Sequence, residues 1–91
     1  MKNMPIHEIN SDADFFIDIT SEVCPLTFVK TKLLIERMAI GQTAEVRLKG
    51  REPLENVPRS VTDHGHAVLS LVPETSAEDE FGIHRLHIQK I

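Results

Sequence analysis

Cys24 has the most reactive side chain in this sequence, and Pro25 follows it directly. Proline is favoured at the first position of a helix, so Cys24 is expected at or next to the N-cap of a helix. Unpaired backbone N–H groups and the positive end of the helix dipole favour a thiolate at that place, and they lower the pKa of a thiol. Thiolate is the nucleophilic form, so this position predicts a reactive cysteine.

Two neighbours of Cys24 support this chemistry. Pro25 has no N–H and therefore cannot compete for the sulfur. Thr27 is expected near the third helical position, where its hydroxyl can donate to the sulfur or cap the backbone. The alternative is a buried Cys24 that acts as a small apolar side chain. A thiol peroxidase commonly has a threonine shortly before its reactive cysteine and an arginine nearby. This function is not expected here, because Thr20 is four residues before Cys24 and the loop has no arginine.

The spacing of the histidines and the single cysteine predicts no metal site, and a reaction that uses one thiol needs no organic cofactor. The chain has one cysteine, which excludes an internal disulfide and disfavours a cysteine-based zinc site. His64 is expected on the buried stripe of a helix, and Gly65 is expected to cap that helix in a left-handed conformation. His84 and His87 are three residues apart in a strand and should point to opposite faces.

Hydrophobic periodicity predicts six elements in the order β-α-β-α-β-β. The pattern of residues 43–49 alternates, which indicates a strand with one face in water. Pro58 lies inside the second helical stripe and predicts a kink or a late helix start. The expected strands are 15–19, 43–49, 67–72 and 83–90, and the expected helices are 25–39 and a second one that ends near residue 64.

These elements predict an α/β fold, a two-layer sandwich in which a four-stranded mixed sheet carries two helices on one face. Right-handed strand-helix-strand crossovers are expected to make the first pairings parallel, and the final hairpin adds an antiparallel strand. The length of 91 residues fits a single domain at 14–91, preceded by a flexible N-terminal arm at 1–13.

Composition narrows the function classes. A net charge of −4 and the absence of Tyr and Trp argue against direct nucleic-acid binding. No window approaches the ~18 apolar residues of a membrane span, and the N-terminus lacks the features of a signal peptide. We therefore expect a cytoplasmic monomer that does not engage a membrane.

The first helix carries apolar residues on two arcs. The arc assigned to the core holds Phe28, Thr31, Leu34, Ile35 and Met38. The other arc holds Leu26, Val29 and Leu33, and it is either a partner-docking stripe beside Cys24 or a surface that packs against the second helix.

Residues 15–91 resemble the TusA/SirA family of small sulfur-carrier proteins. The resemblance rests on Asp18 six residues before Cys24, on Cys24-Pro25 at a helix start, on a helix that ends in Met38 and is closed by Gly41, and on the Asn-Val-Pro run at 56–58. The sequence reads Cys-Pro-x-Thr where the family has Cys-Pro-x-Pro, and Ser21 stands where the family usually has glycine.

The resemblance implies the same fold and a sulfurtransferase-like persulfide carrier. Cys24 would accept a sulfane sulfur from a cysteine desulfurase or another sulfurtransferase and pass it to an acceptor protein, with Pro25, Thr27 and Asp18 in support. The alternative is a non-catalytic interaction or regulatory module of the same fold, in which Cys24 is structural.

Overall fold

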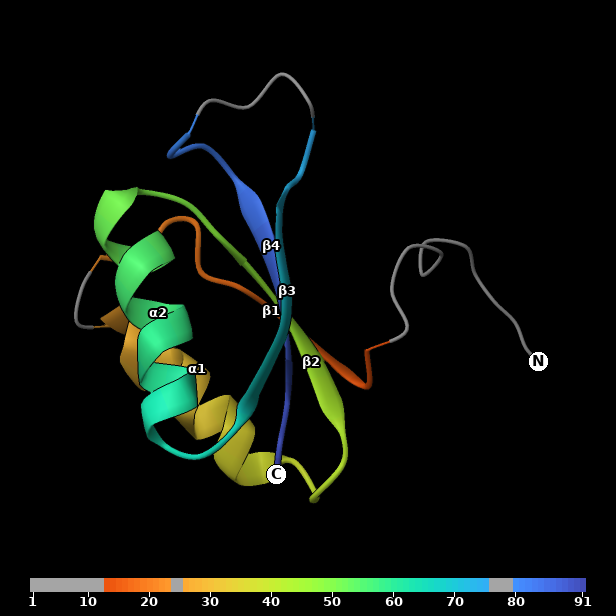
Figure 1. Ribbon diagram of the computed structural model, residues 1–91. Coiled ribbons are helices and arrows are strands. Elements are labelled where there is room, and N and C mark those ends of the chain that lie inside the picture. Colours follow the sequence, from red (N-terminus) through yellow and green to blue (C-terminus); the bar gives the residue numbers. More distant parts are fainter. Residues whose placement is uncertain (1–12, 24–25, 76–79) are drawn as a thin grey trace.

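The computed structural model describes residues 13–23, 26–75 and 80–91. Its elements follow the expected order, with two helices on one face of a four-stranded sheet (Figure 1). The predicted fold class is therefore confirmed. The elements are β1 (Phe15–Asp18), α1 (Leu26–Arg37), β2 (Thr43–Leu48), α2 (Arg51–Asp63), β3 (Ala67–Pro73) and β4 (His84–Gln89).

The sheet order is β1-β2-β4-β3. β1 and β2 pair in parallel, as expected from the first crossover. The second crossover does not pair its two strands, because β4 lies between β2 and β3 and is antiparallel to both. The expectation of a second parallel pairing was therefore wrong, and β1 and β3 form the two edges of the sheet.

The hydrophobic core lies between the sheet and the helices. Side chains from β2 and β4 meet those of both helices there. The buried apolar residues are Ile19, Leu34, Ile35, Met38, Ala44, Val46, Leu48, Val57, Val61, Leu86 and Ile88.

The first helix is shorter than predicted at its C-terminal end. The backbone N–H of Ala39 donates to Oε1 of Gln42 at 2.7 Å, and that of Gly41 donates to the carbonyl of Lys90 at 2.8 Å. These N–H groups are bonded outside the helix, so α1 ends at Arg37. Thr31, Leu34, Ile35 and Met38 are buried as expected, whereas Phe28 is only partly buried.

The second helix starts earlier than Pro58 suggested, at Arg51, and continues through the proline to Asp63. Gly65 has φ 89°, and the N–H groups of Gly65 and His66 donate to Thr62 and Val61, which is a Schellman cap. His64 is exposed rather than on the buried stripe, and its ring lies 5.3 Å from that of Phe28.

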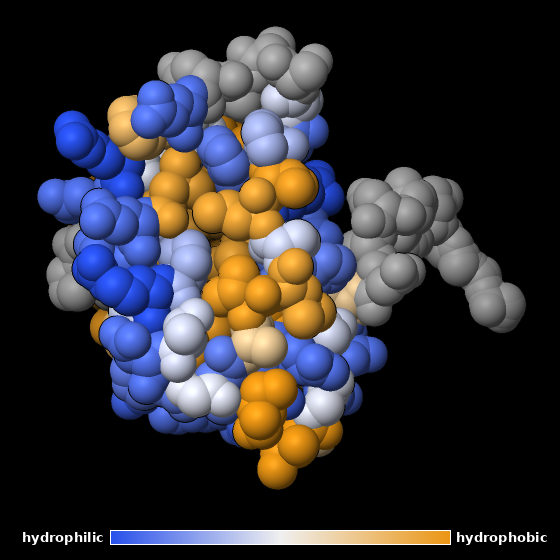
Figure 2. Space-filling view, viewed as in Figure 1, coloured by the Kyte–Doolittle hydropathy of each residue, from blue (hydrophilic) through white to orange (hydrophobic). Residues whose placement is uncertain are grey.

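The opposite face of the sheet is polar, with one exception to the predicted alternation. Glu45 was expected in water but is 3% exposed. Arg85 of the neighbouring strand β4 covers it and donates to its carboxylate at 2.7 Å. Along the edge strand β3, Leu69, Leu71 and Val72 are exposed. Figure 2 shows apolar side chains gathered along the middle of the view, where β3 runs in Figure 1.

Candidate functional site

The predicted reactive residue follows the loop that joins β1 to α1. Cys24 and Pro25 lie outside the described residues, so the position and reactivity of the thiol remain predictions. On either side of them, the N–H of Leu26 donates to the carbonyl of Val23 at 2.8 Å. This bond ties the last described residue of the loop to the first residue of α1, which follows Cys24-Pro25 directly.

Asp18 organises the start of this loop. Its Oδ1 accepts hydrogen bonds from the backbone N–H of Thr20 at 2.9 Å and from the Thr20 hydroxyl at 2.7 Å. Its Oδ2 accepts from Nη1 of Arg47 at 2.9 Å. These bonds, chiefly the two from Thr20, hold the pKa of Asp18 below its ordinary value. An ionised Asp18 thus anchors the loop to the neighbouring strand.

Thr27 is the second residue of α1, one position earlier than expected, and it is fully buried. Its backbone carbonyl accepts a hydrogen bond from the Thr31 hydroxyl at 2.8 Å. Thr27 therefore belongs to the buried side of the helix start. A contact between its hydroxyl and the Cys24 sulfur remains a prediction.

Leu26, Val29 and Leu33 are 45%, 40% and 54% exposed. Their spacing places them along one side of α1, which follows directly after Cys24-Pro25. At these exposures α2 does not bury the three side chains. The alternative that this stripe packs against the second helix is therefore not supported. Whether a partner docks there remains a prediction.

A hollow of about 680 Å³ lies beside the loop. One wall is residues 20–23, a second is the turn from β2 into α2 at residues 49–53, and a third is Phe81 from the β3–β4 hairpin. The N–H of Gly50 donates to the carbonyl of Phe81 at 2.9 Å, and the Arg51 guanidinium lies 5.7 Å from the centroid of the Phe81 ring. The turn from β2 into α2 and the β3–β4 hairpin are thus in direct contact where they line the hollow.

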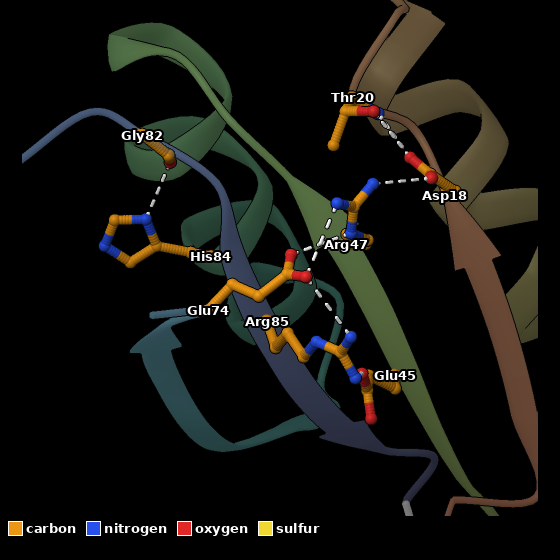
Figure 3. Close-up of polar contacts among 8 residues, drawn as sticks. All are labelled: Asp18, Thr20, Glu45, Arg47, Glu74, Gly82, His84 and Arg85. Atoms are coloured by element: carbon orange, nitrogen blue, oxygen red, sulfur yellow. Dashed lines mark hydrogen bonds and ion pairs between the residues drawn. The ribbon is translucent and has the colours of Figure 1, made fainter. Parts of the chain in front are cut away.

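A charged network crosses the polar face of the sheet, and sequence reasoning did not identify it (Figure 3). Arg47 donates to both oxygens of Glu74 through Nε at 2.8 Å and Nη2 at 3.4 Å, and to Asp18. Arg85 donates to Glu45 at 2.7 Å and reaches Glu74 at 3.5 Å. The hydrogen bond from Arg47 is the largest cause of the lowered pKa of Glu74, and the bond to Glu74 likewise raises the pKa of Arg47.

One signal for this network was present in the sequence. Arg47 alternates with Glu45 on the polar side of its strand, and Arg85 has the same place in the last strand. Their pairing depends on the strand order, which places Asp18 beside Arg47 and Arg47 beside Arg85. That order was not predicted in full.

The described residues offer little for a metal ion or a membrane. No group of three or more His, Cys, Asp or Glu side chains among them is arranged to hold a metal. His84 instead contacts the carbonyl of Gly82 through Nδ1 at 2.8 Å. Neither of the helices described combines the length and apolar character that crossing a bilayer requires.

Comparison with known proteins relates this sequence to a sulfurtransferase family and to proteins described as sulfur carriers. A family model described as "Sulfurtransferase TusA" matches residues 15–90. The chain is 42% identical over 72 residues to a candidate sulfur carrier protein of Archaeoglobus fulgidus, covering 79% of this chain and 80% of that protein. It is 33% identical over 61 residues to one from Methanocaldococcus jannaschii, covering 67% of this chain and 80% of the relative.

A solved structure shares the fold. The crystal structure of a SirA-like protein from Desulfitobacterium hafniense superposes with a TM-score of 0.66 at 17% sequence identity, and the match covers 82% of this chain and 95% of that one.

Proposed function

The chain belongs to the TusA family of sulfurtransferases, and from this membership we propose that it carries sulfane sulfur as a persulfide on Cys24. The observation that carries the proposal is the match over residues 15–90 together with a helix that begins directly after Cys24-Pro25. A carrier of this kind needs a reduced thiol, which suits the cytoplasm. It also needs two protein partners, a sulfur donor and a sulfur acceptor.

The transfer proceeds by two exchanges at sulfur. The Cys24 thiolate attacks the outer sulfur of the donor's persulfide, the S–S bond of the donor breaks, and its electron pair leaves on the donor's cysteine thiolate. Cys24 then carries the additional sulfur. An acceptor nucleophile, such as a second protein's thiolate, attacks that outer sulfur and releases Cys24 as a thiolate. The electrons balance within each exchange, so no external oxidant, metal or organic cofactor takes part.

Asp18 supports this chemistry by ordering the loop before Cys24. Its carboxylate fixes Thr20 through two hydrogen bonds, and the bond from the Leu26 N–H to the Val23 carbonyl ties the loop to the first residue of α1. The first N–H groups of a helix and its dipole favour an anion in front of them. The same features stabilise both the thiolate and the persulfide anion.

The Thr27 departure from the family motif is compatible with transfer. Thr27 is fully buried, so this substitution alters the inner side of the helix start rather than the surface that a partner meets. Ser21 is exposed in the loop. Neither change removes the thiol or the helix that follows it.

We assign partner docking to Leu26, Val29 and Leu33. A protein partner that delivers sulfur to Cys24 must cover the start of α1, and these exposed side chains lie along that helix. Apolar burial at the centre of an interface is a main source of binding free energy.

Intact mass spectrometry tests the carrier function. The chain is incubated with a cysteine desulfurase and cysteine, and the expected product is a gain of one sulfur atom that a reductant removes. Cys24→Ser is the matched control, since Cys24 is the single cysteine of the chain. If the wild-type protein stays unmodified and Cys24 alkylates slowly near neutral pH, the non-catalytic module with a structural Cys24 replaces this proposal.

A pair of matched variants tests the docking stripe. Leu33→Ser on α1 is expected to raise the donor concentration needed for half-maximal sulfur acceptance several-fold, in line with the ~1–2 kcal/mol of an interface contact. Leu69→Ser is the control, because Leu69 is 52% exposed, close to the 54% of Leu33, but lies on β3. Equal behaviour of the two variants would exclude the stripe as the docking site.

A further inference from the structure

Arg47 contacts the loop before Cys24 in two ways. Its backbone carbonyl accepts a hydrogen bond from the N–H of Ile19 at 2.9 Å, and its guanidinium donates to Asp18 at 2.9 Å. The N–H of Glu22 in turn donates to the carbonyl of Ile19 at 3.1 Å. The position of the loop therefore depends on β2 through Arg47.

Asp18 transmits the position of Arg47 to the loop. One carboxylate oxygen accepts from the Thr20 N–H at 2.9 Å and from the Thr20 hydroxyl at 2.7 Å, and the other oxygen accepts from Arg47. A carboxylate held at both oxygens has one orientation. Removal of the guanidinium frees Asp18 to rotate, and Thr20 loses a fixed anchor.

The other end of the same guanidinium holds the β3–β4 hairpin. Nε and Nη2 of Arg47 contact the two oxygens of Glu74, a two-point geometry that fixes direction as well as distance. Glu74 pairs through its N–H with the carbonyl of Ile83 at 2.9 Å, and Phe81, two residues earlier, lines the hollow beside the cysteine loop. Arg47 thus contacts Asp18, which bonds to Thr20 in one wall of that hollow, and Glu74, which pairs with the strand that follows Phe81.

We propose that Arg47 is a positioning residue for sulfur transfer, whose guanidinium sets the distance between the Cys24 loop and the hairpin and so orients the thiol toward an incoming persulfide. This inference rests on the function proposed above. Ion pairs as exposed as Arg47–Asp18, with side chains 26% and 41% exposed, add little to stability. Their position between the loop that contains Thr20 and the β3–β4 hairpin favours a role in geometry.

Sulfur-transfer kinetics with Arg47→Gln and Arg47→Lys test the proposal. Misplacement of a reacting group by ~1 Å can slow a reaction by up to ~10²-fold, so for Arg47→Gln we expect roughly a tenfold lower rate at saturating donor and little change in the half-saturating donor concentration. Arg47→Lys retains the charge but lacks the planar fork, so it is expected to restore the rate only in part. A structural role alone would not separate the rate from donor binding in this way.

Arg59→Gln is the control for the loss of a surface arginine. Arg59 pairs with Glu55 at 3.8 Å on the exposed side of α2 and is expected to leave the rate unchanged. A wild-type rate in folded Arg47→Gln overturns the proposal. If circular dichroism shows that Arg47→Gln does not fold, Glu74→Gln removes one partner only, and a wild-type rate in that variant overturns it instead.

Alkylation of Cys24 by iodoacetamide across pH separates this proposal from the carrier function. If the wild-type protein accepts no sulfur, the carrier function fails, but the alkylation profile still reports on the loop. A profile that differs between wild type and Arg47→Gln, but not between wild type and Arg59→Gln, supports positioning of Cys24. Identical profiles in all three proteins overturn it.

Discussion

Replacement of Arg85 by methionine is expected to destabilise the fold through the carboxylate that it leaves behind. Glu45 is 4% exposed at its side chain, and its contact with Arg85 is a hydrogen-bonded ion pair of 2.7 Å. Methionine retains the apolar stem of arginine but supplies no cation, so Arg85→Met strands the Glu45 charge beneath the sheet surface.

The structure sets the magnitude of this effect. Breaking a fully buried pair costs about 3–5 kcal/mol, and a charge-assisted hydrogen bond contributes about 1.5–3 kcal/mol. The side chain of Arg85 is 31% exposed, so water reaches part of the site and the lower range applies. We expect a loss of about 2 kcal/mol in the free energy of unfolding, which corresponds to a decrease in Tm of ~8–16 °C for a domain of this size.

Urea denaturation and thermal melts of four proteins measure it: wild type, Arg85→Met, Glu45→Gln and the double variant. Glu45→Gln keeps an acceptor for Arg85 and is expected to cost about 1 kcal/mol. In the double variant no charge is stranded, so its loss should be smaller than the sum of the two single losses. A stability of Arg85→Met within about 0.5 kcal/mol of wild type, or strict additivity in the double variant, would refute this reasoning.

Two further predictions concern backbone strain and acid stability. Gly65→Ala is expected to lower the free energy of unfolding by about 1–2 kcal/mol in urea titrations, because φ at this position is 89°. Apart from its chain neighbours, no atom that the structure describes lies within 4 Å of the added Cβ, so the loss has no contribution from a clash. Gly65→Asn should lose less, and equal losses in the two variants would contradict a purely backbone origin. Asp18 and Glu74 have pKa values below their ordinary 3.8 and 4.5, so the stability they add is present above those values and is lost as pH falls through the lower folded pKa values. Because Arg47 is the largest cause of the shift at Glu74 and Thr20 that at Asp18, Arg47→Gln should weaken mainly the Glu74 part of this acid dependence. An unchanged pH dependence of unfolding would argue against the network as its cause.

Much of the fold follows from local patterns: two strands alternate between apolar and polar residues, the second helix has apolar residues at helical spacing, and proline and glycine mark the ends of the first helix. Strands 43–48 and 84–89 were expected within one residue of their observed ends. The insertion of β4 between β2 and β3 was missed, because a strand's own pattern does not say which neighbour it pairs with. The burial of Glu45 was missed for the same reason, because Arg85, the cation that pairs with it, comes from β4.

The candidate site was predictable to a different degree. Asp18 was named through the family resemblance, and Leu26, Val29 and Leu33 were named from their common arc on the first helix. Arg47 was not identified, because it lies 29 positions from Asp18 and 27 from Glu74 in sequence. Local patterns report which face a residue occupies, and only the strand order shows that these three side chains meet.

The two ends of the charged network have different expected effects, one on the stability of the fold and the other on the position of the loop before Cys24. At one end, Glu45 is sealed by Arg85 in the middle of the sheet, so a change there alters the free energy of unfolding. At the other end, Asp18 is 41% exposed and joins Arg47 of β2 to Thr20 of the loop, so a change there costs little energy but moves the loop. Arg85→Met should therefore lower Tm without changing the alkylation profile of the folded protein, whereas Arg47→Gln should change that profile with a smaller loss of Tm. Because Glu74 touches both arginines, it is the one residue of the network whose loss should affect both measurements.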